Sequence, residues 1–206
     1  MRRLLLVFLK FPQQGRVKTR LAAEIGPEKA VRIYRQLVEE VFLSLANPGH
    51  VSLRVTFDPP EKVEEVKSWI TGLGMGELEF CPQGEGDLGN RMRTAFLAGF
   101  NDGFDQICVI GTDTPEIDQS HLSAAWTAME KGVDLVFGPA LDGGFYLFAT
   151  TRPEHLEVLQ SVSWSQNDTL EQCLKRADAR NWHTTLLTPL RDIDTLDDWL
   201  AYGSSE

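Results

Sequence analysis

A short apolar segment that ends in a glycine and precedes an aspartate constrains this chain most. Residues 107–115 read Ile-Cys-Val-Ile-Gly-Thr-Asp-Thr-Pro, a buried-strand pattern with Asp113 just beyond it. In open α/β sheets, ligands bind in the crevice outside the carboxyl ends of the strands. We therefore predict that Asp113 faces a crevice and holds a metal ion. Alternatively, Asp113 and Thr114 form a turn or cap the helix that begins near Asp118.

Strand-length apolar runs alternate with helical stripes along the rest of the chain. The predicted strands cover residues 4–9, 51–57, 78–81, 107–110, 133–137, 145–148 and 182–187. The predicted helices cover residues 26–46, 60–70, 88–100, 118–131, 169–180 and those from 196 onward. This alternation predicts an α/β fold with a largely parallel sheet and helices on both of its faces.

The length and composition indicate one domain. The 206 residues are 42% hydrophobic and no linker-like tract divides them, so we expect a single domain over residues 1–206. The longest early apolar run, residues 4–9, cannot span a membrane and lacks a signal-peptide cleavage site, which predicts a cytoplasmic protein. Cys81, Cys108 and Cys173 are too widely separated for a disulfide framework or a zinc site. The four histidines share no ligand spacing, so we expect surface or cap positions.

Positive charge is concentrated in the first twenty residues of an acidic chain. The net charge is −10, which argues against nonspecific binding of nucleic acid. The first twenty residues nevertheless contain no Asp or Glu and six cations, Arg2, Arg3, Lys10, Arg16, Lys18 and Arg20. Pro12 and Gly15 predict an irregular loop after the first strand, and its cations suit phosphate. The loop lacks the glycines of a Walker loop and of a dinucleotide fingerprint, which excludes a P-loop protein and a Rossmann dehydrogenase.

Two further aspartates and a tryptophan are candidate site residues. Asp142 starts an Asp-Gly-Gly segment in which Gly143 and Gly144 would let a ligand come close, although an ordinary hairpin turn fits equally well. Asp142 could act as a general base or bind a sugar hydroxyl. Asp194 lies where the chain leaves its last predicted strand. Trp164 could form a wall of an acceptor pocket or belong to the core.

Five motifs occur in order along nearly the whole chain. They are Lys10-Phe11-Pro12 with Gly15-Arg16-Val17-Lys18-Thr19-Arg20-Leu21, Asp87-Leu88-Gly89-Asn90-Arg91-Met92, Gly111-Thr112-Asp113-Thr114-Pro115, Gly138-Pro139 with Asp142-Gly143-Gly144-Phe145-Tyr146-Leu147, and Asp192-Ile193-Asp194-Thr195. Together they resemble the DUF2064 family of glycosyltransferase A-type proteins, which is related to the molybdenum-cofactor and phospholactate nucleotidyltransferases. Thr114 stands where that family usually has cysteine or serine, and Leu196 where it has proline. Neither departure removes a charged group.

The resemblance implies a nucleotide-diphospho-sugar transferase fold, a Rossmann-like three-layer α/β/α architecture with a mixed, mainly parallel sheet. It also implies that Asp113 and Asp194 bind Mg²⁺ or Mn²⁺, with Asp192 as the reserve ligand. The catalytic positions would be Lys18, Asp113 and Asp142, and the acceptor would contact Gly143, Gly144 and Trp164. The nucleotide would be bound by Phe11, Gly15, Arg16, Lys18, Arg20, Asp87, Arg91 and Thr112.

We therefore expect a metal-dependent transferase that uses a nucleotide-activated donor. The leading expectation is a glycosyltransferase, which moves a sugar from a nucleotide-diphospho-sugar to an unknown acceptor. One alternative is a nucleotidyltransferase that joins a nucleoside triphosphate to a small phosphorylated acceptor and releases pyrophosphate. The other is a nucleotide-binding protein without turnover. The expected partners are the nucleotide donor and a small-molecule acceptor, without nucleic acid or a membrane span, and a homodimer is a candidate oligomeric state.

Overall fold

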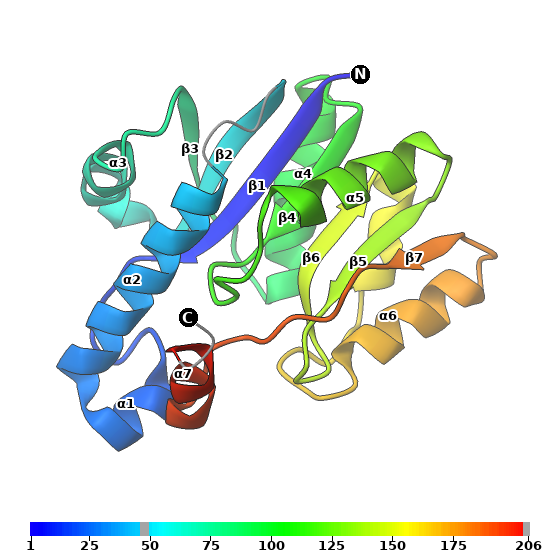
Figure 1. Cartoon of the computed structure of the whole chain (residues 1–206). Helices are drawn as coiled ribbons and strands as arrows, with labels where there is room; N and C mark the ends of the chain where they lie inside the picture. Colours follow the sequence, from blue (N-terminus) through cyan, green and yellow to red (C-terminus); the bar gives the residue numbers. More distant parts are fainter. Residues whose placement is uncertain (46–49, 204–206) are drawn as a thin grey trace.

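The computed structural model describes residues 1–45 and 50–203 and contains a seven-stranded sheet flanked by helices (Figure 1). The strands are β1 (Arg3–Lys10), β2 (Val51–Asp58), β3 (Leu78–Pro82), β4 (Gln106–Ile110), β5 (Leu135–Pro139), β6 (Phe145–Thr150) and β7 (Thr184–Leu186). The α-helices are α1 (Thr19–Ile25), α2 (Pro27–Ser44), α3 (Val63–Thr71), α4 (Leu88–Asn101), α5 (Gln119–Glu130), α6 (Thr169–Asp178) and α7 (Leu196–Gly203). Two 3-10 helices are η1 (Pro60–Lys62) and η2 (Pro153–Leu159).

The strands follow the order β3-β2-β1-β4-β6-β5-β7 across the sheet. All neighbours pair in parallel except β6, which runs antiparallel to β4 and β5. The predicted mixed, mainly parallel sheet is therefore confirmed, and the Asp-Gly-Gly segment is part of a β5–β6 hairpin. The carboxyl ends of β1, β4 and β5 lie along the same edge of the sheet as the amino end of β6. Ligands of parallel α/β sheets bind at this edge.

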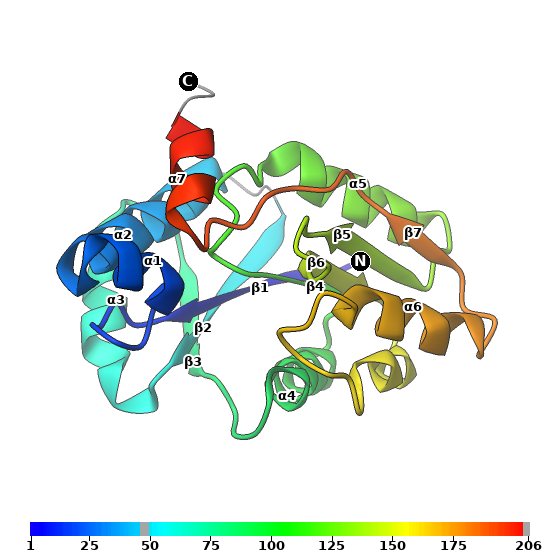
Figure 2. The ribbon, with the colours of Figure 1, turned by 90° about the horizontal axis from the view of Figure 1, so that it is seen from below.

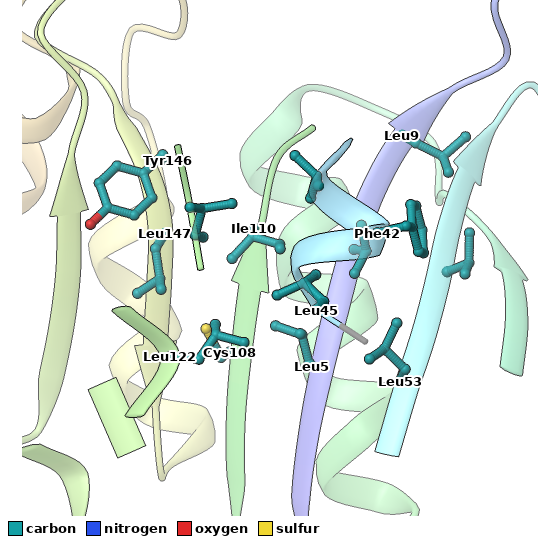
Figure 3. Packing of buried hydrophobic residues seen from close by; sticks show 14 of the residues in the cluster. Leu5, Leu9, Phe42, Leu45, Leu53, Cys108, Ile110, Leu122, Tyr146 and Leu147 are labelled. Carbon is teal, nitrogen blue, oxygen red and sulfur yellow. The ribbon is translucent and has the colours of Figure 1, made fainter. Parts of the chain in front are cut away.

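Strand β1 is central and is covered on both faces, because its residues 4–9 are apolar throughout and almost completely buried. Successive side chains of a strand point to opposite faces. Leu5 and Leu9 join a cluster with residues of α2, α3 and α5, whereas Leu4 and Phe8 join a second cluster with residues of α4, α6 and η2. Figure 3 shows Leu5 and Leu9 on the face that α2 covers.

The helices form the two outer layers. Figure 2 shows α2 and α5 on one side of the sheet and α4 and α6 on the other. Helix α2 buries a stripe that includes Tyr34, Val38 and Val41 at the spacing of one helical face. Each fully buried apolar side chain of this size stabilises the fold by about 1.5–3 kcal/mol relative to exposure. The predicted three-layer α/β/α architecture is therefore confirmed.

Three elements differ from the sequence-based expectations. Helix α1 begins at Thr19, within the segment predicted to be a loop, because a seven-residue helix that buries only Leu21 gives no recognisable stripe. The 3-10 helix η2 was not predicted, and β7 is shorter than the expected strand at residues 182–187. The expected helix end near Ala46 lies outside the described residues. In the part of the chain that is described, no helix has both the length and the apolar character to cross a bilayer.

His50 and His183 are exposed, whereas the other two histidines lie at a helix cap and in the interior. His121 completes the capping box of α5 with Asp118, as expected for a cap position. His155 is buried, which contradicts the expectation of a surface or cap position, because η2 carries its ring against the side chains of Thr150 and Trp182. Burial lowers the pKa of His155, and the charge of nearby Asp134 opposes that shift without cancelling it.

Candidate active site

A cleft of about 790 Å³ lies at the edge of the sheet where β1 and β4 end. Small-molecule sites have volumes of roughly 300–1,000 Å³, so the cleft is large enough for a nucleotide. Its lining residues come from the end of β1 and the loop after it, the end of β4 and the loop after it, the start of α4, the β5–β6 hairpin, residues 164–166, Asp192 and Asp194. Most of the predicted site residues line this cleft.

Lys18, Asp113 and Asp194 meet at one point of the cleft. The Nζ atom of Lys18 donates a hydrogen bond to Oδ1 of Asp194 at 3.0 Å and forms an ion pair with Oδ1 of Asp113. The Lys18 side chain is only 2% exposed, whereas those of Asp113 and Asp194 are 48% and 44% exposed. The structure therefore brings together the predicted metal ligands and the predicted phosphate-binding lysine around a single ammonium group.

The segment after β7 carries Asp194 to this point from far along the chain. It runs beside the β5–β6 hairpin, where the backbone N–H of Leu190 donates to the carbonyl of Pro139 at 3.0 Å. It then reaches the loop after β4, where the N–H of Ile193 donates to the carbonyl of Asp113 at 2.9 Å. These backbone hydrogen bonds fix the position of Asp194 next to Asp113, so the pairing does not depend on the side chains alone.

The backbone holds Lys18 in an uncommon conformation. Lys18 is the N-cap residue of α1 and lies in the left-handed region, with φ 45° and ψ 49°. For a residue other than glycine, this conformation is unfavourable in free energy. It therefore occurs where the surrounding structure strongly determines the backbone. Burial by itself would lower the pKa of Lys18, but the charges of Asp113 and Asp194 outweigh burial and raise it. Lys18 is therefore a charged ammonium at neutral pH.

Asp192 has a different environment from Asp194, two residues later. Asp192 is partly buried at the wall of the cleft, where its carboxylate accepts a hydrogen bond from Oγ1 of Thr114. Burial, together with the negative charges of Asp113 and Asp142, raises the pKa of Asp192 to about 7, although the Thr114 hydrogen bond acts in the opposite direction. Asp194 is therefore the hydrogen-bond partner of Lys18, and Asp192 is the partner of Thr114.

The loop between β1 and α1 and the first turn of α1 contribute further positive charge to the cleft. Arg16 and Arg20 are exposed cleft-lining residues, and neither forms an ion pair within residues 1–45 and 50–203. Arg91, at the start of α4, instead donates hydrogen bonds to the Gly86 carbonyl and to the Gln83 side chain. Arg16 and Arg20 therefore keep their hydrogen-bond donors free for an anion.

The opposite wall of the cleft combines a carboxylate with two aromatic rings. Asp142 accepts a hydrogen bond from the N–H of Gly144 through Oδ1, at 2.9 Å. The rings of Phe145 and Trp164 pack edge to face with centroids 6.1 Å apart. The indole N–H of Trp164 is buried and has no acceptor in the described part of the chain. Trp164 thus both lines the cleft and packs against the protein, which combines the two alternatives raised by the sequence.

Three predicted residues do not line the cleft. Phe11 lies at a separate depression with Trp69, under the ammonium of Lys62 at 5.1 Å from the ring centroid. Gly15 is part of the loop but not of the lining. Gly143 has φ +90°, and a Cβ atom there would lie 1.9 Å from the Asn167 carbonyl oxygen. Gly143 is therefore required for close packing of the hairpin against the segment before α6.

Two cleft residues have structural contacts that the motifs alone did not indicate. Asp87 is the N-cap of α4 and accepts a hydrogen bond from the N–H of Asn90 at 2.8 Å. Tyr34 belongs to the apolar stripe of α2, but its hydroxyl contacts both the N–H and the carbonyl of Lys10, at 2.9 and 3.1 Å. Burial raises the pKa of the Tyr34 hydroxyl. Tyr34 therefore holds the end of β1. The sequence signal that could have indicated this contact is a hydroxyl-bearing residue within the apolar stripe of the helix.

The carboxylates of Asp113 and Asp194 fit a divalent cation only if other ligands complete its shell. Both reach the same Nζ atom and both are half exposed to the cleft. Over the described residues, no group of three or more His, Cys, Asp or Glu side chains could hold a metal ion. Mg²⁺ often binds through one or two carboxylates together with substrate phosphates and water. The donor set therefore suits a metal that is shared with a phosphorylated ligand.

Residues 41–166 match the family described as an uncharacterized protein conserved in bacteria, DUF2064. No curated protein matches the chain. A crystal structure of a candidate nucleotide-diphospho-sugar transferase from Desulfovibrio desulfuricans G20 is similar over 100% of this chain and 88% of its own, with 28% identity and a TM-score of 0.89.

Two more distant solved structures are similar over nearly the whole chain. The 4-diphosphocytidyl-2C-methyl-D-erythritol synthase from Anaerococcus prevotii DSM 20548 has a TM-score of 0.65 at 10% identity, over 98% of this chain and 96% of its own. The manganese complex of Rv0371c from Mycobacterium tuberculosis H37Rv has a TM-score of 0.59 at 15% identity, over 99% of this chain and 100% of its own. At these identities the similarity shows the fold, the nucleotide-diphospho-sugar transferase type of α/β architecture.

Proposed function

Because the chain belongs to the DUF2064 family, we propose that it is a metal-dependent transferase that uses a nucleotide-activated donor. The leading reaction is transfer of a sugar from a nucleotide-diphospho-sugar to a small-molecule acceptor. One observation carries this proposal: Lys18, Asp113 and Asp194 meet at a cleft that is large enough for a nucleotide. The similarity to the Desulfovibrio protein supports it further.

The cationic part of the cleft would bind the donor phosphates. The guanidinium groups of Arg16 and Arg20 have no ion pair with any described residue, and a guanidinium contacts phosphate most strongly when it binds in a bidentate manner. Mg²⁺ or Mn²⁺ held by Asp113 and Asp194 would neutralise charge on the departing nucleoside diphosphate. Lys18 lies close enough to both carboxylates to contact the same phosphate oxygens.

The opposite wall would hold the acceptor. Oδ1 of Asp142 is occupied by the N–H of Gly144, while Oδ2 has no hydrogen-bond partner in the described part of the chain. In the proposed reaction, the acceptor hydroxyl oxygen bonds to the anomeric carbon as the bond from that carbon to the phosphate oxygen breaks. The hydroxyl proton passes to Asp142 and the electron pair leaves with the nucleoside diphosphate. The rings of Phe145 and Trp164 would exclude water from this side.

Nucleotidyl transfer is the second candidate. Lys10, Arg16 and Arg20 line the cleft without an ion pair to any described residue, and their charges also suit the larger negative charge of a nucleoside triphosphate. In this reaction a phosphate oxygen of the acceptor attacks the α-phosphorus and pyrophosphate leaves. The 4-diphosphocytidyl-2C-methyl-D-erythritol synthase among the structural neighbours has the same fold.

One product assay distinguishes these reactions. Purified protein with Mn²⁺ is incubated with labelled nucleotide sugars and, separately, with nucleoside triphosphates, and Asp113→Asn serves as the matched control. Free nucleoside diphosphate that depends on Asp113 indicates glycosyl transfer, whereas pyrophosphate indicates nucleotidyl transfer. Nucleotide-dependent thermal stabilisation without either product would instead indicate a binding protein without turnover. Absence of any nucleotide binding would overturn the proposal.

A further inference from the structure

The ammonium of Lys18 lies where a cation shared by Asp113 and Asp194 would lie. It contacts Oδ1 of both carboxylates, and its side chain is buried while theirs are half exposed to the cleft. A lysine that only attracted phosphate could extend into the cleft, as the exposed Arg16 and Arg20 do. Lys18 instead points at the acidic pair and neutralises part of its charge.

The backbone determines this placement. Lys18 is locked in the left-handed region at the start of α1, where its carbonyl accepts the first helical hydrogen bond from Ala22 at 2.8 Å. A residue other than glycine keeps such a conformation only where the surrounding structure fixes it. The side chain can still change direction through its own rotatable bonds, because only the backbone is fixed.

The protein offers a divalent cation few other ligands at this point. Asp113 and Asp194 are the two carboxylates at the ammonium, and Asp192 is engaged with Thr114. No cluster of three potential metal-binding side chains exists in residues 1–45 and 50–203. A free divalent cation would therefore have to displace Lys18 while gaining only two protein carboxylates.

We propose that Lys18 acts as an internal counter-ion that excludes free divalent cations from Asp113 and Asp194, so that the cleft takes Mg²⁺ or Mn²⁺ only together with a polyphosphate. This inference rests on the proposed nucleotide-dependent function. The phosphate oxygens attract the ammonium away from the carboxylates and at the same time supply the missing metal ligands. Lys18 keeps its proton throughout. Its ammonium moves from the two aspartates to the polyphosphate, and the metal ion takes its place at the aspartates.

Manganese binding tests this exchange directly. Water proton relaxation, which rises when Mn²⁺ joins a slowly tumbling protein, is measured for the wild type with Mn²⁺ alone and with Mn²⁺ plus inorganic tripolyphosphate. The same titrations use Lys18→Met, a similar-sized side chain without the charge, and Lys29→Met, which removes an exposed lysine of α2 that does not line the cleft. Thermal unfolding of each variant, with and without Mn²⁺, reports whether it is folded.

The wild type and Lys29→Met are expected to bind Mn²⁺ alone only at millimolar concentration. Lys18→Met is expected to bind Mn²⁺ alone at least tenfold more tightly, and adding Asp113→Asn should remove that gain. Lys18→Met should also be stabilised by Mn²⁺ far more than the wild type, as follows from ligand-linked stability. In the wild type, tripolyphosphate should bring Mn²⁺ to the protein.

Equal Mn²⁺ affinity for Lys18→Met and the wild type would overturn the inference. So would micromolar binding of Mn²⁺ alone to the wild type that Asp113→Asn abolishes, a result that needs no Lys18 variant and decides the matter even if Lys18→Met does not fold. These failures would leave the proposed function standing if nucleotide binding still depended on Asp113. Conversely, a Lys18→Met gain without any nucleotide binding or product would support the exchange and contradict the transferase.

Discussion

Arg54 and Lys18 are both buried cations that bridge two half-exposed carboxylates, in two different regions of the molecule. Arg54 lies on β2 and donates to Glu79 from Nε and to Asp102 from Nη2, each at 2.7 Å. Its side chain is 7% exposed, close to the 2% of Lys18. The local arrangement is therefore nearly the same, and the difference between the two regions must come from their surroundings.

The surroundings of Arg54 are regular and balanced. Arg54 and Glu79 are register partners on β2 and β3, and Arg2 supplies a second cation by donating to the Asp102 carbonyl at 2.7 Å. Arg54 does not line the cleft. This arrangement ties the edge of the sheet to the end of α4, and it offers no unpaired charge to a ligand.

The surroundings of Lys18 are irregular and acidic. Its backbone is left-handed, and Asp142 and Asp192 add acidic groups close to the pair that it already bridges. The carboxylates face an open cleft. A buried ion pair is by itself weak evidence for function or stability. The comparison shows that excess negative charge, a left-handed backbone conformation and an open cleft together distinguish a candidate site from a structural ion pair.

The largest expected effect comes from removing one carboxylate of each pair. Asp113→Asn should weaken Mn²⁺-dependent binding of a nucleoside diphosphate by about 100-fold, since it removes a metal ligand, whereas Asp102→Asn should change it by less than about twofold. Isothermal titration calorimetry measures both affinities. Unchanged affinity in Asp113→Asn, with the fold intact, would remove the distinction between the two regions.

Removing the cation of the balanced pair should affect stability instead of binding. Arg54→Met should lower the free energy of unfolding by about 2 kcal/mol, because it leaves Glu79 and Asp102 without their shared partner. Lys175→Met, which breaks an exposed pair with Glu171, should lower the free energy of unfolding far less, because solvent screens that pair. Urea unfolding measures the two values. A loss of nucleotide affinity in Arg54→Met would show that this pair is coupled to the cleft.

Removing the charge of Lys18 should weaken the binding of phosphorylated ligands more than that of unphosphorylated ones. Lys18→Ala should weaken binding of nucleoside di- and triphosphates by about tenfold, while binding of the bare nucleoside should stay nearly constant, because only phosphate exchanges partners with the ammonium. Competition titrations with both ligands give the ratio. An equal loss for both would mean that Lys18 has the same bracing role as Arg54.

The smallest effect is the contribution of His155, which does not line the cleft, to the pH dependence of stability. The folded-state pKa of His155 is lowered below the unfolded value of about 6.5, so the unfolded chain binds more protons and stability should fall as pH decreases from 7 toward 5. The raised pKa of Asp192 gives the opposite slope, with stability lost as pH rises toward 7. The difference in unfolding free energy between wild type and His155→Gln isolates the histidine. A difference that does not change with pH would show that His155 does not titrate in this range.

The sequence predicted the alternation of strands and helices because each buried element is long enough to show its period. The six apolar residues at 4–9 correctly predicted a strand that is covered on both faces. Helix α1 escaped prediction because it is short and buries only Leu21. The 3-10 helix η2 buries His155, Leu156, Val158 and Leu159, and it escaped because its seven residues are too few to show a helical period. The antiparallel direction of β6 agrees with the hairpin alternative at Asp142, because the short connection at residues 140–144 cannot join parallel strands.

The sequence also placed Lys18, Asp113 and Asp194 at the ends of strands, and the structure brings them to one edge. It could not show that the lysine lies between the two aspartates, since this depends on contacts between residues 176 positions apart. Nor could the pattern separate Asp192 from Asp194, because residues two positions apart in an extended segment are expected on the same side. Their different partners, Thr114 and Lys18, are set by tertiary contacts. The sequence suggested that Gly143 lets a ligand come close. In the structure the position requires glycine because a Cβ atom would collide with the Asn167 backbone.

The central claim is that Asp113, Asp194 and Lys18 form a single site for a metal and a polyphosphate. A crystal structure with Mn²⁺ and a nucleoside diphosphate, phased to locate manganese by its anomalous scattering, tests this claim most directly. We expect one manganese peak between the carboxylates of Asp113 and Asp194, with the Lys18 ammonium moved onto a phosphate oxygen. Manganese bound elsewhere, with Lys18 still between the two aspartates, would contradict the account.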